Sequence, residues 1–93
     1  MSKLVVRSLP WGSFYRFSCP GCKHDHVYTV RTDGKEVCWS FNGDLDHPTF
    51  SPSLLNTTET TRCHLFLTDG KLQFLGDCTH HLAGQTVDLP YID

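Results

Sequence analysis

The stretch Cys19-Pro20-Gly21-Cys22 constrains the fold of this chain more than any other feature. Two thiols two residues apart, separated by a Pro-Gly turn, are the usual half-site of a structural zinc. The turn can aim both sulfurs and nearby main-chain N–H groups at one cation. The chain has 93 residues, and a domain of this size has only a thin hydrophobic core. Because metal binding commonly stabilises such domains, we expect one zinc-stabilised domain spanning residues 1–93.

Composition narrows the class of protein. An apolar fraction of 39% is typical of a compact domain, and a formal net charge of −2 provides no basic excess to attract nucleic acid. No segment approaches the ~20 apolar residues that span a bilayer, and residues 1–10 lack the apolar run of a signal peptide. We therefore expect a cytoplasmic protein with no membrane partner. In that compartment the five cysteines would be ligands or packed thiols rather than disulfides.

Strand patterns dominate the chain and predict an all-β or β-rich fold. The tetrapeptide Thr-Asp-Gly-Lys occurs at 32–35 and again at 68–71, and Asp-Gly between alternating segments is typical of a type I′ hairpin. The two predicted hairpins pair residues 26–31 with 36–41 and residues 62–67 with 72–77. We expect further strands at 3–8, 14–18 and 86–89, and at most one short helical turn, at 79–83.

The segment between the hairpins, residues 42–61, is rich in Pro, Asn, Ser and Thr. Pro48 and Pro52 argue against a helix or a central strand there. The acidic residues of this segment lack the glycine and terminal glutamate of a calcium-binding EF-hand loop. Two roles stay open for residues 42–56: a loop that packs onto the sheet through its apolar side chains, or a partner-binding loop.

The second hairpin supplies candidates for the remaining metal ligands. Cys63 lies on its predicted inner face, and Cys78 has the same parity. His80 shares that parity if the strand continues. We predict a zinc site of Cys19, Cys22, Cys63 and Cys78, with His80 as the alternative fourth ligand and His24 and His26 as weaker candidates. The structural alternative is that these cysteines are unrelated buried thiols that bind no metal. We expect such a role for Cys38, packed under a loop.

A second group comprises His64, Asp77, His80 and His81, with His47 as a further candidate. A carboxylate beside imidazoles suits general acid–base chemistry or an open metal site. The structural alternative is that Asp77 pairs with Arg62 across the hairpin. The sequence contains no Ser-centred nucleophile elbow, no phosphate-binding glycine loop and no HExxH motif. A redox role for Cys19 and Cys22 is disfavoured because no long helix follows them.

Several blocks of the sequence resemble one known family. They are Cys19-Pro20-Gly21-Cys22, residues 39–44 (WSFNGD), residues 48–53 (PTFSPS), Cys63-His64 and residues 77–86 (DCTHHLAGQT). Together they are similar to a family of small uncharacterised zinc-binding proteins of tailed bacteriophages and prophages, some of which carry a misleading ammonia monooxygenase label. The resemblance implies phage origin and a bacterial host cytoplasm. It also implies one common site of Cys19, Cys22, Cys63, His64, Asp77 and His80, and it favours His80 over Cys78 because serine can replace Cys78.

Two function classes follow. The favoured hypothesis is a non-enzymatic bacteriophage accessory protein, an interaction module that binds and can inhibit a host or phage protein. The alternative is a metal-dependent hydrolase or nuclease that uses His64, Asp77 and His80 at an open metal position. A nucleic-acid-binding zinc ribbon ranks third because the basic residues are scattered. The sequence leaves open the identity of the partner, the fourth ligand and the oligomeric state.

Overall fold

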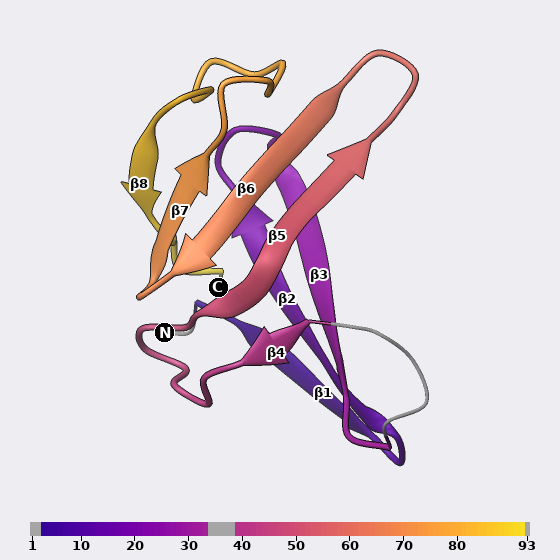
Figure 1. Ribbon diagram of the computed structural model, residues 1–93. Helices are drawn as coiled ribbons and strands as arrows, with labels where there is room; N and C mark the ends of the chain where they lie inside the picture. Colours follow the sequence, from indigo (N-terminus) through magenta and orange to yellow (C-terminus); the bar gives the residue numbers. More distant parts are fainter. Residues whose placement is uncertain (1–2, 34–38, 93) are drawn as a thin grey trace.

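The computed structural model describes residues 3–33 and 39–92, which form two antiparallel β-sheets (Figure 1). The first sheet has the order β1-β2-β3 and the second has the order β4-β5-β6-β7-β8. The strands are β1 (Val5–Leu9), β2 (Gly12–Cys19), β3 (His24–Arg31), β4 (Ser40–Phe41), β5 (Phe50–Thr57), β6 (Arg62–Thr68), β7 (Lys71–Phe74) and β8 (Thr86–Asp88). The predicted β-rich class is therefore confirmed, and no helix occurs in the described ranges.

The first sheet departs from the predicted pairing. β3 pairs along its whole length with β2, from Gly12 opposite Arg31 to Cys19 opposite His24, whereas β4 pairs with β5. The Cys19–Cys22 turn reverses the chain, and Lys23 continues the reversal with a φ of 65° and donates its N–H to the Cys19 carbonyl at 2.9 Å. The predicted pairing of 26–31 with 36–41 is thus wrong for residues 39–41. Residues 34–38, which include Gly34 and Lys35 of the predicted turn and also Cys38, lie outside the described residues.

The second hairpin has the predicted register. Leu65 lies opposite Phe74, and Leu67 lies opposite Leu72. Asp69 and Gly70 form the turn with φ values of 51° and 74°, as a type I′ turn requires. β8 then pairs with β7, which confirms a strand close to the C-terminal end. Residues 81–84 form a turn rather than a helix.

β5 corrects the expectation that prolines exclude a strand between the hairpins. Phe50 lies opposite Leu67, but the next paired residue is Leu54, so the register shifts across residues 51–53. Pro52 falls within this irregularity, where the missing N–H breaks no ladder hydrogen bond. Because of this shift in register, the side chains of residues 51–53 need not follow the regular alternation between the two faces of the sheet.

The core lies between the two sheets. Tyr28 of β3 stacks on Phe50 of β5 with ring centroids 4.2 Å apart, and both side chains are fully buried. In Figure 1 β2 and β3 of the first sheet pass behind β5 and β6, as this contact requires. Trp39 adds an edge-to-face contact with Tyr28 at 5.3 Å. The two sheets therefore pack face to face through aromatic side chains.

The acidic side chains between β4 and β5 order their own loop. The Asn42 side-chain oxygen accepts hydrogen bonds from the N–H groups of Asp44 and Thr49. One Asp44 oxygen accepts from the N–H groups of His47 and Asp46, and these bonds lower the pKa of Asp44. Such side chain to main chain bonds are the ordinary function of Asn and Asp in turns.

The described residues form no helix that is long and apolar enough to cross a membrane.

Candidate functional site

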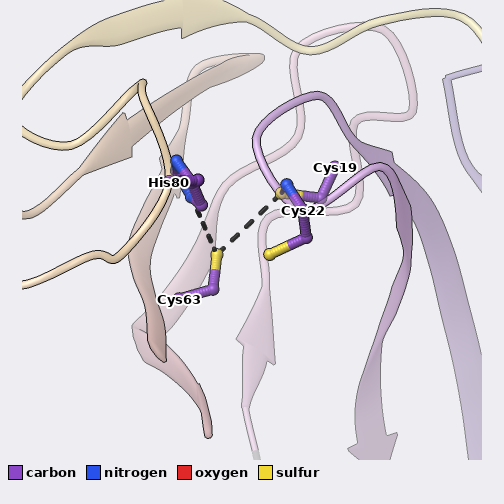
Figure 2. Close-up of side chains that lie close together, drawn as sticks. All are labelled: Cys19, Cys22, Cys63 and His80. Atoms are coloured by element: carbon purple, nitrogen blue, oxygen red, sulfur yellow. Dashed lines mark hydrogen bonds between the residues drawn. The ribbon is translucent and has the colours of Figure 1, made fainter. Parts of the chain in front are cut away.

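Four side chains from distant parts of the chain converge at one end of the sandwich (Figure 2). Cys19 and Cys22 come from the β2–β3 turn, Cys63 comes from β6, and His80 comes from the loop after β7. Their ligand atoms all lie within 4.8 Å of one another. The set therefore joins the first sheet to the second and could hold a metal ion.

The spacing of these atoms suits tetrahedral zinc. With Zn–S bonds of about 2.3 Å and Zn–N bonds of about 2.0 Å, the edges of the tetrahedron are about 3.8 Å between sulfurs and about 3.5 Å between sulfur and nitrogen. The Cys19 and Cys63 sulfurs are 3.9 Å apart, and the Cys63 sulfur is 3.5 Å from Nε2 of His80. Three thiols and one imidazole are also a common structural zinc set. The residues present fit the metal that the sequence predicts.

The local packing fixes His80 at the cluster. Its ring meets Phe74 edge to face at 4.6 Å, and its Nδ1 lies 3.2 Å from the Leu82 main-chain nitrogen. On the other side, a Cβ atom at Gly21 would lie 2.3 Å from the His80 ring. The glycine of the Cys-Pro-Gly-Cys turn therefore leaves room for the fourth ligand.

The thiols of the cluster interact strongly without a metal. A hydrogen bond with Cys63 outweighs the effect of burial and lowers the pKa of Cys19 to about 3. The same hydrogen bond raises the pKa of Cys63, and burial raises the pKa of Cys22. Since a metal binds thiolates, loading the site releases the protons that these sulfurs carry.

The remaining metal candidates do not belong to the group of four. The buried Cys78 sulfur contacts both the N–H and the carbonyl of His64 at 3.2 Å instead of joining the group of four. The Cys78 thiol therefore provides a hydrogen-bonding partner for the main chain of β6 at His64, beyond the last residue of β7. His24 is exposed. His26 is buried beside Cys19, whose pKa it helps to lower, and its Nδ1 lies 2.9 Å from the side-chain amide of Asn56 on β5.

A second constellation lies beside the metal cluster. Oγ of Ser53 is 3.1 Å from Nε2 of His64, and Nδ1 of the same ring is 3.3 Å from Oδ2 of Asp77. Ser53 is on β5, His64 is on β6 and Asp77 follows β7. A carboxylate that accepts from Nδ1–H leaves Nε2 free to accept the serine proton, as in the Ser-His-Asp triad.

Asp77 is held as a carboxylate. Desolvation opposes its ionisation, but hydrogen bonds from His64 and Arg62 prevail and lower the pKa of Asp77. Arg62 donates to the same Oδ2 at 3.2 Å. The sequence-based alternative, an Arg62–Asp77 pair, is therefore present in the structure together with the His64 contact.

The structure separates the residues that the resemblance groups into one site. Cys63 and His64 are neighbours on β6, so their side chains point to opposite faces of the sheet. Cys63 is buried at the metal cluster, whereas His64 is half-buried beside Ser53. His80 belongs to the cluster, so His64, Asp77 and His80 do not form the open metal position of the alternative hypothesis. His47 and His81 are exposed, and neither takes part in the Ser53–His64–Asp77 contacts.

Sequence reasoning missed Ser53. It lies in Ser51-Pro52-Ser53, which has no glycine-flanked nucleophile motif, and the segment was expected to be a loop. The signal that could have located it is the β5–β6 pairing. Once Leu55 is opposite His64, Ser53 lies diagonally across from the histidine.

A protein-family model described as "Bacterial ubiquitination-like system serine protease (BubE)" matches residues 3–75, which include Ser53 and His64. The chain belongs to the BubE family. Searches of curated proteins and of solved structures gave no significant match. The family match overturns the prediction of a non-enzymatic phage accessory protein, because the BubE family is named as a protease. It is a bacterial family, and the phage origin stays a prediction.

Proposed function

We propose that this BubE-family chain is a serine protease in which Ser53 is the nucleophile, His64 the general base and Asp77 the residue that orients the base. The observation that carries the proposal is the continuous contact Ser53 Oγ–His64 Nε2–His64 Nδ1–Asp77 Oδ2, at 3.1 and 3.3 Å. Triads are recognised by these roles and this geometry rather than by their order in the sequence. The family name supports the same chemistry independently.

The steps follow from the positions of the protons. Oγ of Ser53 attacks the carbonyl carbon of the scissile bond while Nε2 of His64 takes the hydroxyl proton. The C–N bond then breaks, and the same Nε2 returns the proton to the leaving amine. Water enters, His64 removes one of its protons, and hydrolysis of the acyl-serine ester restores the hydroxyl. Asp77 stabilises the imidazolium that forms in both halves of the reaction.

The metal has a structural role in this proposal. Cys19, Cys22, Cys63 and His80 would hold zinc with no ligand position left for water. When bound, the ion supplies a rigid cross-link next to the triad, because Cys63 adjoins His64 and His80 follows Asp77 by three residues. In this arrangement Cys78 is a support for the His64 main chain and not a ligand.

We propose that the substrate is a protein of a bacterial ubiquitination-like system, as the family name indicates. The partner is then a cytoplasmic bacterial protein that meets the enzyme as a substrate rather than as the target of an inhibitor.

Labelling with a small fluorophosphonate tests the nucleophile without knowledge of the substrate. We expect Ser53 to be phosphonylated, and Ser53→Ala to lose labelling together with about 10⁴-fold or more of any peptidase activity. Ser51→Ala is the matched control, because Ser51 is on the same strand and its hydroxyl contacts none of the triad residues. Labelling that persists in Ser53→Ala, or that never occurs at Ser53, would overturn the proposal.

A further inference from the structure

Within the described part of the chain, the strand that carries Ser53 is unpaired along part of one side. β6 pairs with β5 on one side, and on the other side β4 pairs only with Phe50 and Ser51 (Figure 1). No other strand of residues 3–33 and 39–92 lies beside residues 53–57 in the order of the sheet. Leu55, in the middle of this stretch, is 53% exposed.

The hydrogen bonds of β6 show which groups of β5 point to the open side. The Arg62 carbonyl accepts from the Thr79 N–H at 2.9 Å, and the His64 carbonyl accepts from the Leu75 N–H at 2.9 Å, so both residues turn their main chain toward β7. Because successive residues of a strand alternate, Cys63 and Leu65 face β5 and exchange hydrogen bonds with Asn56 and Leu54.

The residue between those two partners must then face away from β6. The N–H and the carbonyl of Leu55 both point to the open side of the sheet. At Ser53 the carbonyl on that side already accepts from the Trp39 indole N–H at 3.3 Å. Among residues 3–33 and 39–92 no group is hydrogen-bonded to these two atoms, so Leu55 offers a donor and an acceptor two residues from Ser53.

We propose that the substrate segment preceding the scissile bond binds as an added antiparallel strand on this edge of β5. This inference rests on the proposed serine protease function. An antiparallel partner exchanges both of its main-chain hydrogen bonds with Leu55, and its chain runs toward Ser53. The residue that pairs with Leu55 is consequently two residues before the one whose carbonyl is attacked.

This pairing defines a substrate class. The substrate must be extended over at least three residues before the cleavage point, as in a disordered tail or linker. The residue two positions before the scissile carbonyl must have a free N–H, so proline is excluded there. The residue one position before the scissile carbonyl turns its N–H away from β5, so proline is allowed there.

Peptide boronic acids of the form acetyl-Leu-Ala-boroXaa provide the test, where boroXaa is the boronic acid analogue of glycine, alanine or leucine and Leu is the residue that pairs with Leu55. The measured quantity is the degree to which each peptide protects Ser53 from labelling by the small fluorophosphonate. Methylation of the Leu nitrogen removes the hydrogen bond to the Leu55 carbonyl, and we expect about tenfold weaker protection. Methylation of the Ala nitrogen is the matched control, with an expected change of less than about twofold.

Two variants test the other hydrogen bond. Leu55→Pro removes the N–H at a position where an edge strand tolerates proline, and we expect about tenfold weaker protection by the unmodified peptides. Leu55→Ala keeps the N–H and separates the effect of the side chain. Fluorophosphonate labelling of each variant, together with its melting temperature, reports that the site is folded.

The outcomes distinguish the inference from the function on which it rests. If the fluorophosphonate labels Ser53 but both methylated peptides protect equally, or Leu55→Pro and Leu55→Ala weaken protection equally, strand addition is wrong and the serine protease stands. If the fluorophosphonate labels Ser53 and none of the peptides protects Ser53 from this labelling, strand addition is wrong as well. If Ser53 is not labelled at all, both proposals fail.

Discussion

At the scale of single residues, adjacent positions have separate tasks. Cys63 points into the metal cluster and His64 points to the serine on the opposite face of β6. Cys78 and Asp77 are similarly adjacent: one supports the main chain of His64 and the other orients its ring. In the proposed mechanism, a metal bound by Cys63 would fix the main chain next to His64, as preorganised sites require.

Replacing Asp77 by asparagine tests the orientation of His64. The variant removes the charge that stabilises the imidazolium and can hold the ring in the wrong tautomer, so we expect fluorophosphonate labelling to slow by about 10²- to 10⁴-fold. Unaltered labelling would show that Asp77 has no part in the mechanism.

The same variant has a pH-dependent effect on stability. The pKa of Asp77 is lowered in the folded protein, so its contribution is complete above the ordinary carboxyl pKa of about 3.9 and is lost as pH falls through the lowered value. We expect the urea midpoint of the wild type to fall more steeply than that of Asp77→Asn in this acid range. The difference is small because the side chain is 41% exposed.

Gly21→Ala tests the packing of the fourth ligand. The new Cβ would lie 2.3 Å from the His80 ring, so the ring must move away from the cysteines. We expect metal affinity to fall about 10- to 100-fold in competition with a chromophoric chelator. Gly76→Ala is the control, because nothing lies within 4 Å of its added Cβ. Equal affinity of the two variants would exclude His80 as a ligand held by this contact.

At the scale of elements, β5 connects the core to the proposed nucleophile, Ser53. Phe50 at its start is buried against Tyr28, and Ser53 follows after the shift in register. The prolines that argued against a strand are accommodated: Pro48 precedes β5 and Pro52 lies within the shift. The second hairpin was predictable because its turn and its alternating pattern are both local.

Phe50→Ala tests β5 as the strand that holds the sheets together. Removing a fully buried ring from the aromatic stack is expected to lower the free energy of unfolding by about 3–5 kcal/mol in urea titrations. Thr57→Ala, at the exposed end of the same strand, is expected to change it by less than about 0.5 kcal/mol. Similar losses in both variants would contradict the assigned core.

At the scale of the whole molecule, the metal cluster joins the first sheet to the second, because Cys19 and Cys22 lie at the β2–β3 turn and Cys63 lies on β6. The ligands span residues 19–80, so one ion closes most of the chain. Zinc binding can contribute about 10–16 kcal/mol to folding, which is comparable to the total stability of about 5–15 kcal/mol for a small domain.

Removal of the metal is therefore expected to unfold the protein. Excess chelator, or the variant Cys19→Ser, should abolish the cooperative melting transition and the labelling of Ser53 together. A melting curve that is unchanged in excess chelator would show that the fold does not depend on the metal.

The sequence by itself determined the metal half-site, the second hairpin and the β-rich class, because turn chemistry and strand alternation act over a few residues. It also grouped His64 and Asp77, with His80 and His81, as candidates for acid–base chemistry. Only the tertiary structure decided the partner of β3, the exclusion of Cys78 from the group of four, and the position of Ser53 beside His64. Those outcomes depend on how β5 and the Cys19–Cys22 turn pair with distant strands, and no local pattern encodes that pairing.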